Sequence, residues 1–229
     1  MFAHNFLRTV DFAALLGIYP VISGDGRAAP VSNEDMGRTA AVLLTEGPEK
    51  HAGKSYRPTG PKLLNGREMS GIVAKAVGHG VLPVNLPFWM LGKVARQQGI
   101  NPYEISCLRF YMEDMKRGTF EFEGGVTDVV EQLTGAPAES FETTARRYAA
   151  LPFARQTLGN RLKAFASFNL TPFYLGYDFD KWDRQMGLPR PQSASLSIDD
   201  AQWRAEHAAQ MAEGEATLGR RSVSAFEAA

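Results

Sequence analysis

The sequence predicts an α/β fold in which helices outnumber a few short strands. Short apolar runs alternate with longer stretches of helical periodicity over residues 1–149, and capping signals mark where several helices begin. After Ala149 the composition changes, because residues 151–190 are dense in aromatic side chains and interrupted by prolines. We therefore divide the chain into residues 1–149 and a helical C-terminal extension, residues 150–229.

The chain is expected to open with a helix over residues 2–16. Apolar side chains recur there at helical spacing, and Gly17 is the kind of residue that commonly ends a helix. Two short strands are expected next, Tyr19 to Ser23 and Ala28 to Val31, on either side of a glycine-containing turn.

The turn between those strands, Gly24 to Ala29, satisfies the G-x-G-x-x-[G/A] fingerprint of a dinucleotide-binding loop. The fingerprint binds a pyrophosphate only where a helix begins at its second glycine. Here Pro30 keeps the preceding residue extended. A better helix start lies at Ser32, which forms a capping signal with Asp35 ahead of a helix reaching Glu46. The pattern therefore predicts a tight turn and no phosphate loop.

The middle of the chain continues the alternation of strands and helices. A short strand is expected at Lys54 to Pro58, and Asn65 with Glu68 caps a helix that stops at Gly78. A further strand is expected at Val81 to Leu86. Apolar periodicity then predicts four helices. The first begins at Phe88, and the other three cover residues 103–116, 126–133 and 139–148.

Composition limits the class of function. Lys plus Arg equals Asp plus Glu at 25 each, so no nucleic-acid partner is expected. The apolar stretch Phe12 to Ile22 is too short to span a bilayer and no signal peptide is recognisable, which predicts a cytoplasmic protein without a membrane partner. The single cysteine, Cys107, is expected to be a buried, inert thiol. The four histidines show no zinc-ligand spacing, so no metal site is predicted.

The extension offers one formal match to a catalytic pattern. Tyr177 and Lys181 have the Tyr-x-x-x-Lys spacing of a proton-donating pair, but they follow the whole predicted core, and aromatic-rich sequence makes chance matches common. We therefore assign them no catalytic role. A last helix is expected, with Ser197 and Asp200 as its cap and Trp203 and His207 within it.

Four segments of residues 1–149, taken in order, resemble the NmrA-like group of atypical short-chain dehydrogenases/reductases. They are FAHNF (2–6), PVSNEDM (30–36), HAGKSYRPTGP (51–61) followed by Leu64 and Glu68, and LTGAP (133–137) followed by Phe141. The resemblance implies a partial Rossmann-type fold whose substrate-binding portion is mostly helical.

The resemblance also implies which residues face the substrate and the nicotinamide: Phe2, His4, Asn5, Phe88 and Trp89. Asn5 would orient a polar group, and His4 would exchange a proton near neutral pH. Phe88 and Trp89 would line an apolar pocket. Catalytic residues are not assigned.

In that family the glycine-rich turn precedes the counterpart of Phe2, so we expect the dinucleotide-binding half to lie outside this sequence. The chain would then be the substrate-binding portion of an NAD(P)-dependent oxidoreductase acting on a small hydrophobic molecule. Alone it would bind no NAD(P) and show no turnover, and it would pair with its missing N-terminal half or with another chain. Sheet edges left open in such a portion favour oligomerisation. The alternative is a non-catalytic module that senses dinucleotide or regulates a partner.

Overall fold

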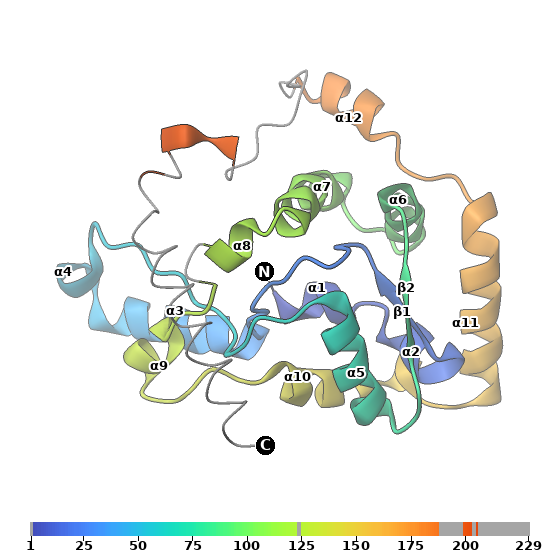
Figure 1. Ribbon diagram of the computed structural model, residues 1–229, viewed down its shortest axis with the longest axis horizontal. Coiled ribbons are helices and arrows are strands. Elements are labelled where there is room, and N and C mark those ends of the chain that lie inside the picture. The colour runs from blue at the N-terminus through green and yellow to red at the C-terminus, as the bar shows by residue number, and fades with distance from the viewer. Residues whose placement is uncertain (1, 123–124, 188–198, 203–204, 206–229) are drawn as a thin grey trace.

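The computed structural model describes residues 2–122, 125–187, 199–202 and 205. Helices predominate, and the described part contains one sheet of two strands (Figure 1). This is the predicted α/β class, mostly helical with few short strands. Most of the last expected helix, including Ser197, Trp203 and His207, lies outside the described residues, and residues 201, 202 and 205 of it are described as helical.

The first predicted helix is confirmed, with one interruption. It forms as α1 (Ala3–Leu7) and α2 (Val10–Leu16), which are separated at Arg8 and Thr9. Gly17 ends α2 in the left-handed conformation at φ 70° and donates its N–H to the Ala13 carbonyl oxygen at 3.1 Å.

The sheet joins two segments that lie far apart in the sequence. Strand β1 (Ile18–Val21) runs parallel to β2 (Leu82–Asn85), with Ile18 opposite Leu82 and Val21 opposite Asn85. Both strands confirm predicted apolar runs. Their parallel pairing requires the long crossover that the helices between them supply.

Two other expected strands are wrong. Residues 28–31 do not pair with β1, because Ala28 bridges Leu64 and Val31 bridges Phe2. Residues 54–58 form no strand. The glycine-containing turn itself is confirmed: Gly24 has a φ of 57°, and the Gly26 N–H donates to the Ser23 carbonyl oxygen at 3.2 Å.

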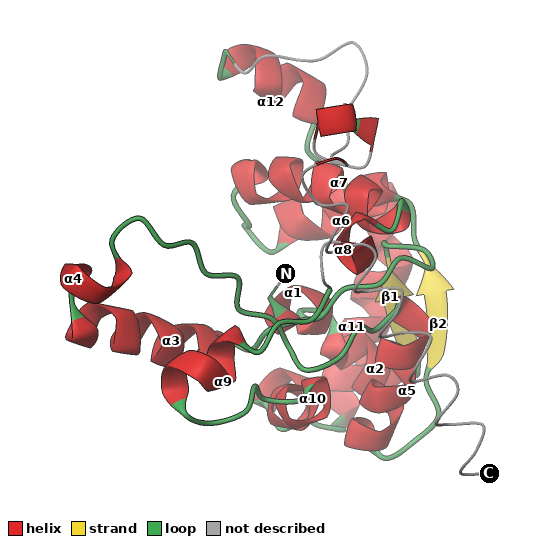
Figure 2. Cartoon of the chain, turned by 60° about the vertical axis from the view of Figure 1, so that its left-hand side comes forward, coloured by secondary structure: helices red, strands yellow, loops and turns green. Residues whose placement is uncertain are grey.

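Capping side chains fix the starts of two predicted helices. The Ser32 hydroxyl accepts from the Asp35 N–H at 3.0 Å and begins α3 (Asn33–Glu46). Asn65 and Glu68 form a reciprocal capping box, with both hydrogen bonds at 2.9 Å, at the start of α5 (Gly66–Val77). Between them lies the short helix α4 (Pro48–His51). Figure 2 shows α3 and α4 projecting to the left of the remaining helices.

The second half of the described chain is helical. The helices predicted at 103–116, 126–133 and 139–148, and the one predicted from Phe88, are confirmed with shifted boundaries. In order, the elements are α6 (Phe88–Gln97), α7 (Pro102–Lys116), α8 (Thr119–Phe122), α9 (Val129–Thr134), α10 (Phe141–Ala149), η1 (Pro152–Ala154), α11 (Leu158–Leu170), η2 (Thr171–Phe173) and α12 (Phe179–Gln185).

The main core gathers buried side chains from α1, α2, β1, α5 and α10, and from the extension. The extension contributes Ala154 and Ala164, and Phe168 packs its ring edge against Phe12 of α2 at a centroid distance of 5.6 Å. Farther along, Phe179 of α12 packs with Ala95 and other residues of the α6–α7 pair. No helix within the described ranges is long and apolar enough to cross a membrane.

Candidate functional site

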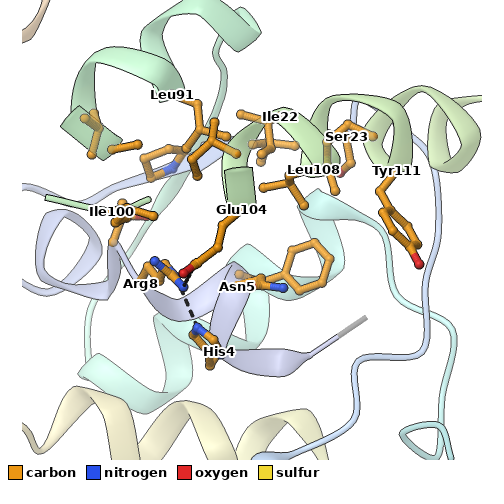
Figure 3. A pocket seen from close by; sticks show the side chains of 18 of the residues that line it. His4, Asn5, Arg8, Ile22, Ser23, Leu91, Ile100, Glu104, Leu108 and Tyr111 are labelled. Carbon is orange, nitrogen blue, oxygen red and sulfur yellow. Dashed lines mark hydrogen bonds and ion pairs between the residues drawn. The ribbon is translucent and has the colours of Figure 1, made fainter. Parts of the chain in front are cut away.

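A cavity of about 450 Å³ lies between α1 and the α6–α7 pair, beside the carboxyl end of β1 (Figure 3). Its volume falls in the range of small-molecule sites, about 300–1,000 Å³. In open α/β sheets, ligands bind outside the carboxyl ends of the strands, and Val21, Ile22 and Ser23 bring that end of β1 to the cavity. The position and the mainly apolar lining make this cavity the candidate binding site.

Helix α1 forms one wall of the cavity because its two faces differ. Ala3 and Leu7 are fully buried in the core, and the Ala3 N–H donates to the Val31 carbonyl oxygen at 2.8 Å. Successive residues of a helix point in different directions, so Asn5 and Arg8 are left to line the cavity. The FAHNF segment therefore places its polar side chains at the candidate site.

A polar chain crosses the cavity wall from α1 to α7. The Arg8 Nε donates to His4 Nε2 at 3.1 Å, and its guanidinium pairs with the Glu104 carboxylate at 3.3 Å. Figure 3 shows these three side chains in a row. Arg8 thereby joins the two walls of the cavity.

The pKa of His4 is lowered from 6.5, first by burial of the ring and then by the charge of Arg8, with opposing contributions from the Glu104 charge and the Asn33 side chain. His4 is therefore mainly neutral at neutral pH. Its Nε2 accepts from Arg8, which puts the proton on Nδ1, and that buried atom has no hydrogen-bond partner among the described residues. In this state His4 positions Arg8 through that hydrogen bond, and the proton exchange that the resemblance implies stays a prediction.

The opposite wall is the apolar face of the α6–α7 pair. Ile105, Leu108 and Met112 recur on α7 at the spacing of one helical face. Periodicity alone could not identify this face as a cavity wall, because cavity and core present the same apolar spacing. In the sequence, the signal that could have indicated a pocket is a second apolar face, on the neighbouring helix α6. The remaining apolar residues of this wall are Leu91, Val94, Ala95, Ile100 and Tyr111.

Cys107 corrects an expectation. It is exposed and lines the cavity, whereas the sequence predicted a buried, inert thiol. The prediction was wrong because Ile105 and Met112 occupy the buried face of α7, and a residue two positions from Ile105 points to another side of the helix.

The expected site residues divide into two groups. Phe2, His4 and Asn5 line the cavity, whereas Phe88 and Trp89 are not among its lining residues. Phe88 lies in the first turn of α6 and packs on Phe179 of α12 at a centroid distance of 5.8 Å. Trp89 is 54% exposed. The cavity is therefore lined by three of the five residues that the resemblance implies at the site.

Tyr177 and Lys181, to which no catalytic role was assigned, take part in structural contacts. The Tyr177 hydroxyl donates to the Ile100 carbonyl oxygen at 2.7 Å and so fastens the extension to the loop after α6. Asp178 is the N-cap of α12, and its carboxylate accepts from the Lys181 N–H at 2.9 Å. Tyr177 therefore lies before the helix and Lys181 within it. Within the described residues, no group of three or more His, Cys, Asp or Glu side chains is placed to hold a metal ion.

The turns that follow the two described strands differ from the phosphate-binding turn of a dinucleotide site. After β1 the next helix begins only at Asn33, well beyond Gly26. A Cβ on Gly26 would lie 2.1 Å from the Met115 carbonyl oxygen, so this glycine is closed off by the backbone of α7 and not open to a phosphate. After β2, the chain enters α6 through Pro87 without a glycine. Neither described strand therefore fits the phosphate-binding turn.

The fold is a partial Rossmann-type α/β fold, shared with solved NAD(P)-dependent reductases. The NADPH-dependent quinone oxidoreductase of Escherichia coli superposes with a TM-score of 0.51 at 20% identity, covering 64% of this chain and 52% of that chain. The Citrobacter triphenylmethane reductase complexed with NADP(H) gives 0.50 at 18% identity, covering 65% and 50%.

Sequence comparison finds homologues that are also reductases. An NAD(P)H azoreductase of Xenophilus azovorans is 24% identical over 149 residues, 65% of this chain and 50% of the relative. The (4-alkanoyl-5-oxo-2,5-dihydrofuran-3-yl)methyl phosphate reductase of Streptomyces griseus is 25% identical over 149 residues, which are again 65% of this chain and 50% of the relative. No family model matches the chain. The chain spans about half the length of the curated relatives it matches.

Proposed function

We propose that this chain is the substrate-binding portion of an NAD(P)H-dependent reductase, and that it does not hold the dinucleotide by itself. The observation that carries the proposal is the cavity at the carboxyl end of β1, which has an apolar α6–α7 wall and a polar α1 wall. The reductase homologues support the reaction class. The unsuitable turn at Gly26 supports the lack of dinucleotide binding.

The substrate that fits this cavity is a small, mainly apolar molecule with one polar group. Apolar side chains of α7 would contact its body, and Asn5 and Arg8 would contact its polar group. The azo, quinone and triphenylmethane compounds named for the relatives are conjugated organic molecules of this kind. In a complete site the bound cofactor would supply the hydride, and the residues of this chain would orient the acceptor.

Titration of the purified chain with NADPH, followed by cofactor fluorescence, tests the first part of the proposal. We expect no saturation at micromolar concentrations, because the described strands lack a pyrophosphate cradle. Saturable binding would contradict this. Saturable binding without turnover of any acceptor would favour the dinucleotide-sensing module instead.

Binding of an apolar azo dye, measured by equilibrium dialysis, tests the cavity. Leu108→Trp fills the cavity from α7 and is expected to weaken binding at least about tenfold, as loss of most of the apolar contact predicts. Phe110→Trp is the matched control, because Phe110 lies on the same helix, is 39% exposed and is not among the lining residues. Equal effects of the two variants, or undiminished binding to Leu108→Trp, would overturn the assignment. Thermal unfolding of both variants checks that the fold is retained.

A further inference from the structure

Helix α11 carries an exposed apolar face that borders a hollow against the end of α2 and residues 79–80. Leu158, Leu162 and Phe165 follow one another at helical spacing and are 76%, 60% and 60% exposed. The opposite face of the same helix is in the core, where Ala164 is buried and Phe168 contacts Phe12. Figure 1 shows α11 at the right-hand margin of the molecule, with α2 on its inner side.

Exposed apolar side chains also follow the end of α11 in the chain. Phe173 and Leu175 follow the helix and are 83% and 76% exposed. Lys93 of α6 donates to the Pro172 carbonyl oxygen and also lies over the Trp89 ring at 5.0 Å. This contact brings the exposed indole of Trp89 next to the end of α11. We call these side chains, from α11 to Trp89, the α11 face.

Within residues 150–177, which include α11, the charged side chains have one sign. Residues 150–177 contain Arg155, Arg161 and Lys163 and no Asp or Glu. All three are exposed, and none is in an ion pair with a described residue. Asp11 of the neighbouring α2 is close enough to Lys163 to be affected by its charge: burial raises the pKa of Asp11, and Lys163 lowers it slightly.

These positive charges favour one binding partner of the α11 face over another. A second copy of the same face would bring like charges together, which is unfavourable. An anionic lipid bilayer offers the complementary chemistry, because its acyl boundary takes up Leu and Phe, its headgroups attract Arg and Lys, and Trp and Tyr side chains favour the interface.

We propose that the α11 face docks the protein on the surface of an anionic lipid bilayer. The helix would lie in the plane of the interface, with Leu158, Leu162 and Phe165 in the acyl boundary and Arg161 and Lys163 at the headgroups. The sequence-based expectation of no membrane partner rested on the short apolar run at residues 12–22, which is a different feature. The docking does not depend on the proposed reductase function.

Vesicle flotation on a density gradient tests the proposal. The full chain is mixed with vesicles of phosphatidylcholine and phosphatidylserine, or of phosphatidylcholine alone. We expect flotation with the anionic vesicles, reduced by salt and by omission of phosphatidylserine. The combined variant Leu158→Ser/Leu162→Ser/Phe165→Ser should lower the partition coefficient about a hundredfold, because it removes the inserted apolar side chains.

Two further variants separate charge from apolar contact. Arg161→Gln/Lys163→Gln should lower the partition coefficient on anionic vesicles about 25-fold, about fivefold for each cation removed. Leu44→Ser is the matched control, because Leu44 is 83% exposed but lies on α3, far from α11 in the sequence and in Figure 1. It should float like the unmodified protein.

Three results would overturn the proposal. The first is no flotation of the unmodified chain, and the second is equal flotation of the triple α11 variant. The third is self-association by light scattering that disappears in the triple variant while no vesicles are bound, which would assign the face to a second copy. Because all three substituted side chains are exposed, circular dichroism of the variant should match that of the unmodified chain.

Discussion

Position 26 has room only for a glycine, because the backbone of α7 lies next to it. Its missing side chain lets the turn after β1 approach α7, and a Cβ would lie 2.1 Å from the Met115 carbonyl oxygen. We expect Gly26→Ala to lower the free energy of unfolding by about 1–3 kcal/mol or more, since a backbone must move. Gly37→Ala is the control: its Cβ meets nothing within 4 Å in the middle of α3, and it should stabilise by about 0.5–1 kcal/mol. Urea unfolding measures both, and the same sign at the two positions would contradict the argument.

His4 makes a second residue-scale prediction, on the pH dependence of stability. Burial lowers the pKa of His4 below the unfolded value of 6.5. As pH falls below 6.5 the unfolded chain takes up this proton first, so stability falls until the pH passes the native pKa. His4→Gln should remove that part of the acid destabilisation. The test is the difference between the urea-unfolding free energies of the two proteins from pH 7 to pH 5. If that difference does not change with pH, burial of His4 does not have this effect.

At the scale of elements, α12 depends on one buried carboxylate. Asp183 accepts from the Ser106 hydroxyl at 3.2 Å and from the Arg109 guanidinium at 3.0 Å, both on α7. Asp183→Ala leaves these donors without that acceptor and should cost about 1–3 kcal/mol. Hydrogen exchange should show faster exchange within α12 and little change within α2. Asp180→Ala, on the same helix but with a carboxylate 57% exposed and 3.8 Å from Arg109, should have a small effect, and equal effects would contradict the prediction.

The elements also show what sequence reasoning could and could not predict. Helix starts were predictable because their signals are local, as Asn65 and Glu68 show by bonding each other across one turn. The strand expected at Ala28 was wrong because pairing is set by distant partners, and Ala28 exchanges both hydrogen bonds with Leu64. The residues of the candidate site also divide into those with a local sequence signal and those placed by distant contacts. The α1 residues came from a motif, whereas Leu108 became a cavity residue only through the position of α7 relative to α1.

At the scale of the whole molecule, the two-stranded sheet raises the question of its free edges. A parallel pair is normally flanked by further strands, and open edges favour oligomerisation. The Leu82 and Leu86 N–H groups donate to the carbonyls of Gly17 and Val21, so alternate residues of each strand face the partner strand. Pro20 and Pro83 fall on the outward-facing positions, and neither has an N–H to donate.

The two prolines therefore reduce the tendency of the sheet to add strands. We expect Pro83→Val to restore a donor on the outer edge of β2, beside the exposed Leu82, and to increase the concentration-dependent mass measured by light scattering. Pro61→Val, at an exposed position outside the sheet, is the matched control and should leave the mass unchanged. A mass for the unmodified chain that rises as steeply as that of Pro83→Val would show that the edges pair despite the prolines. A mass that rises equally in both variants would show that the effect is not specific to β2.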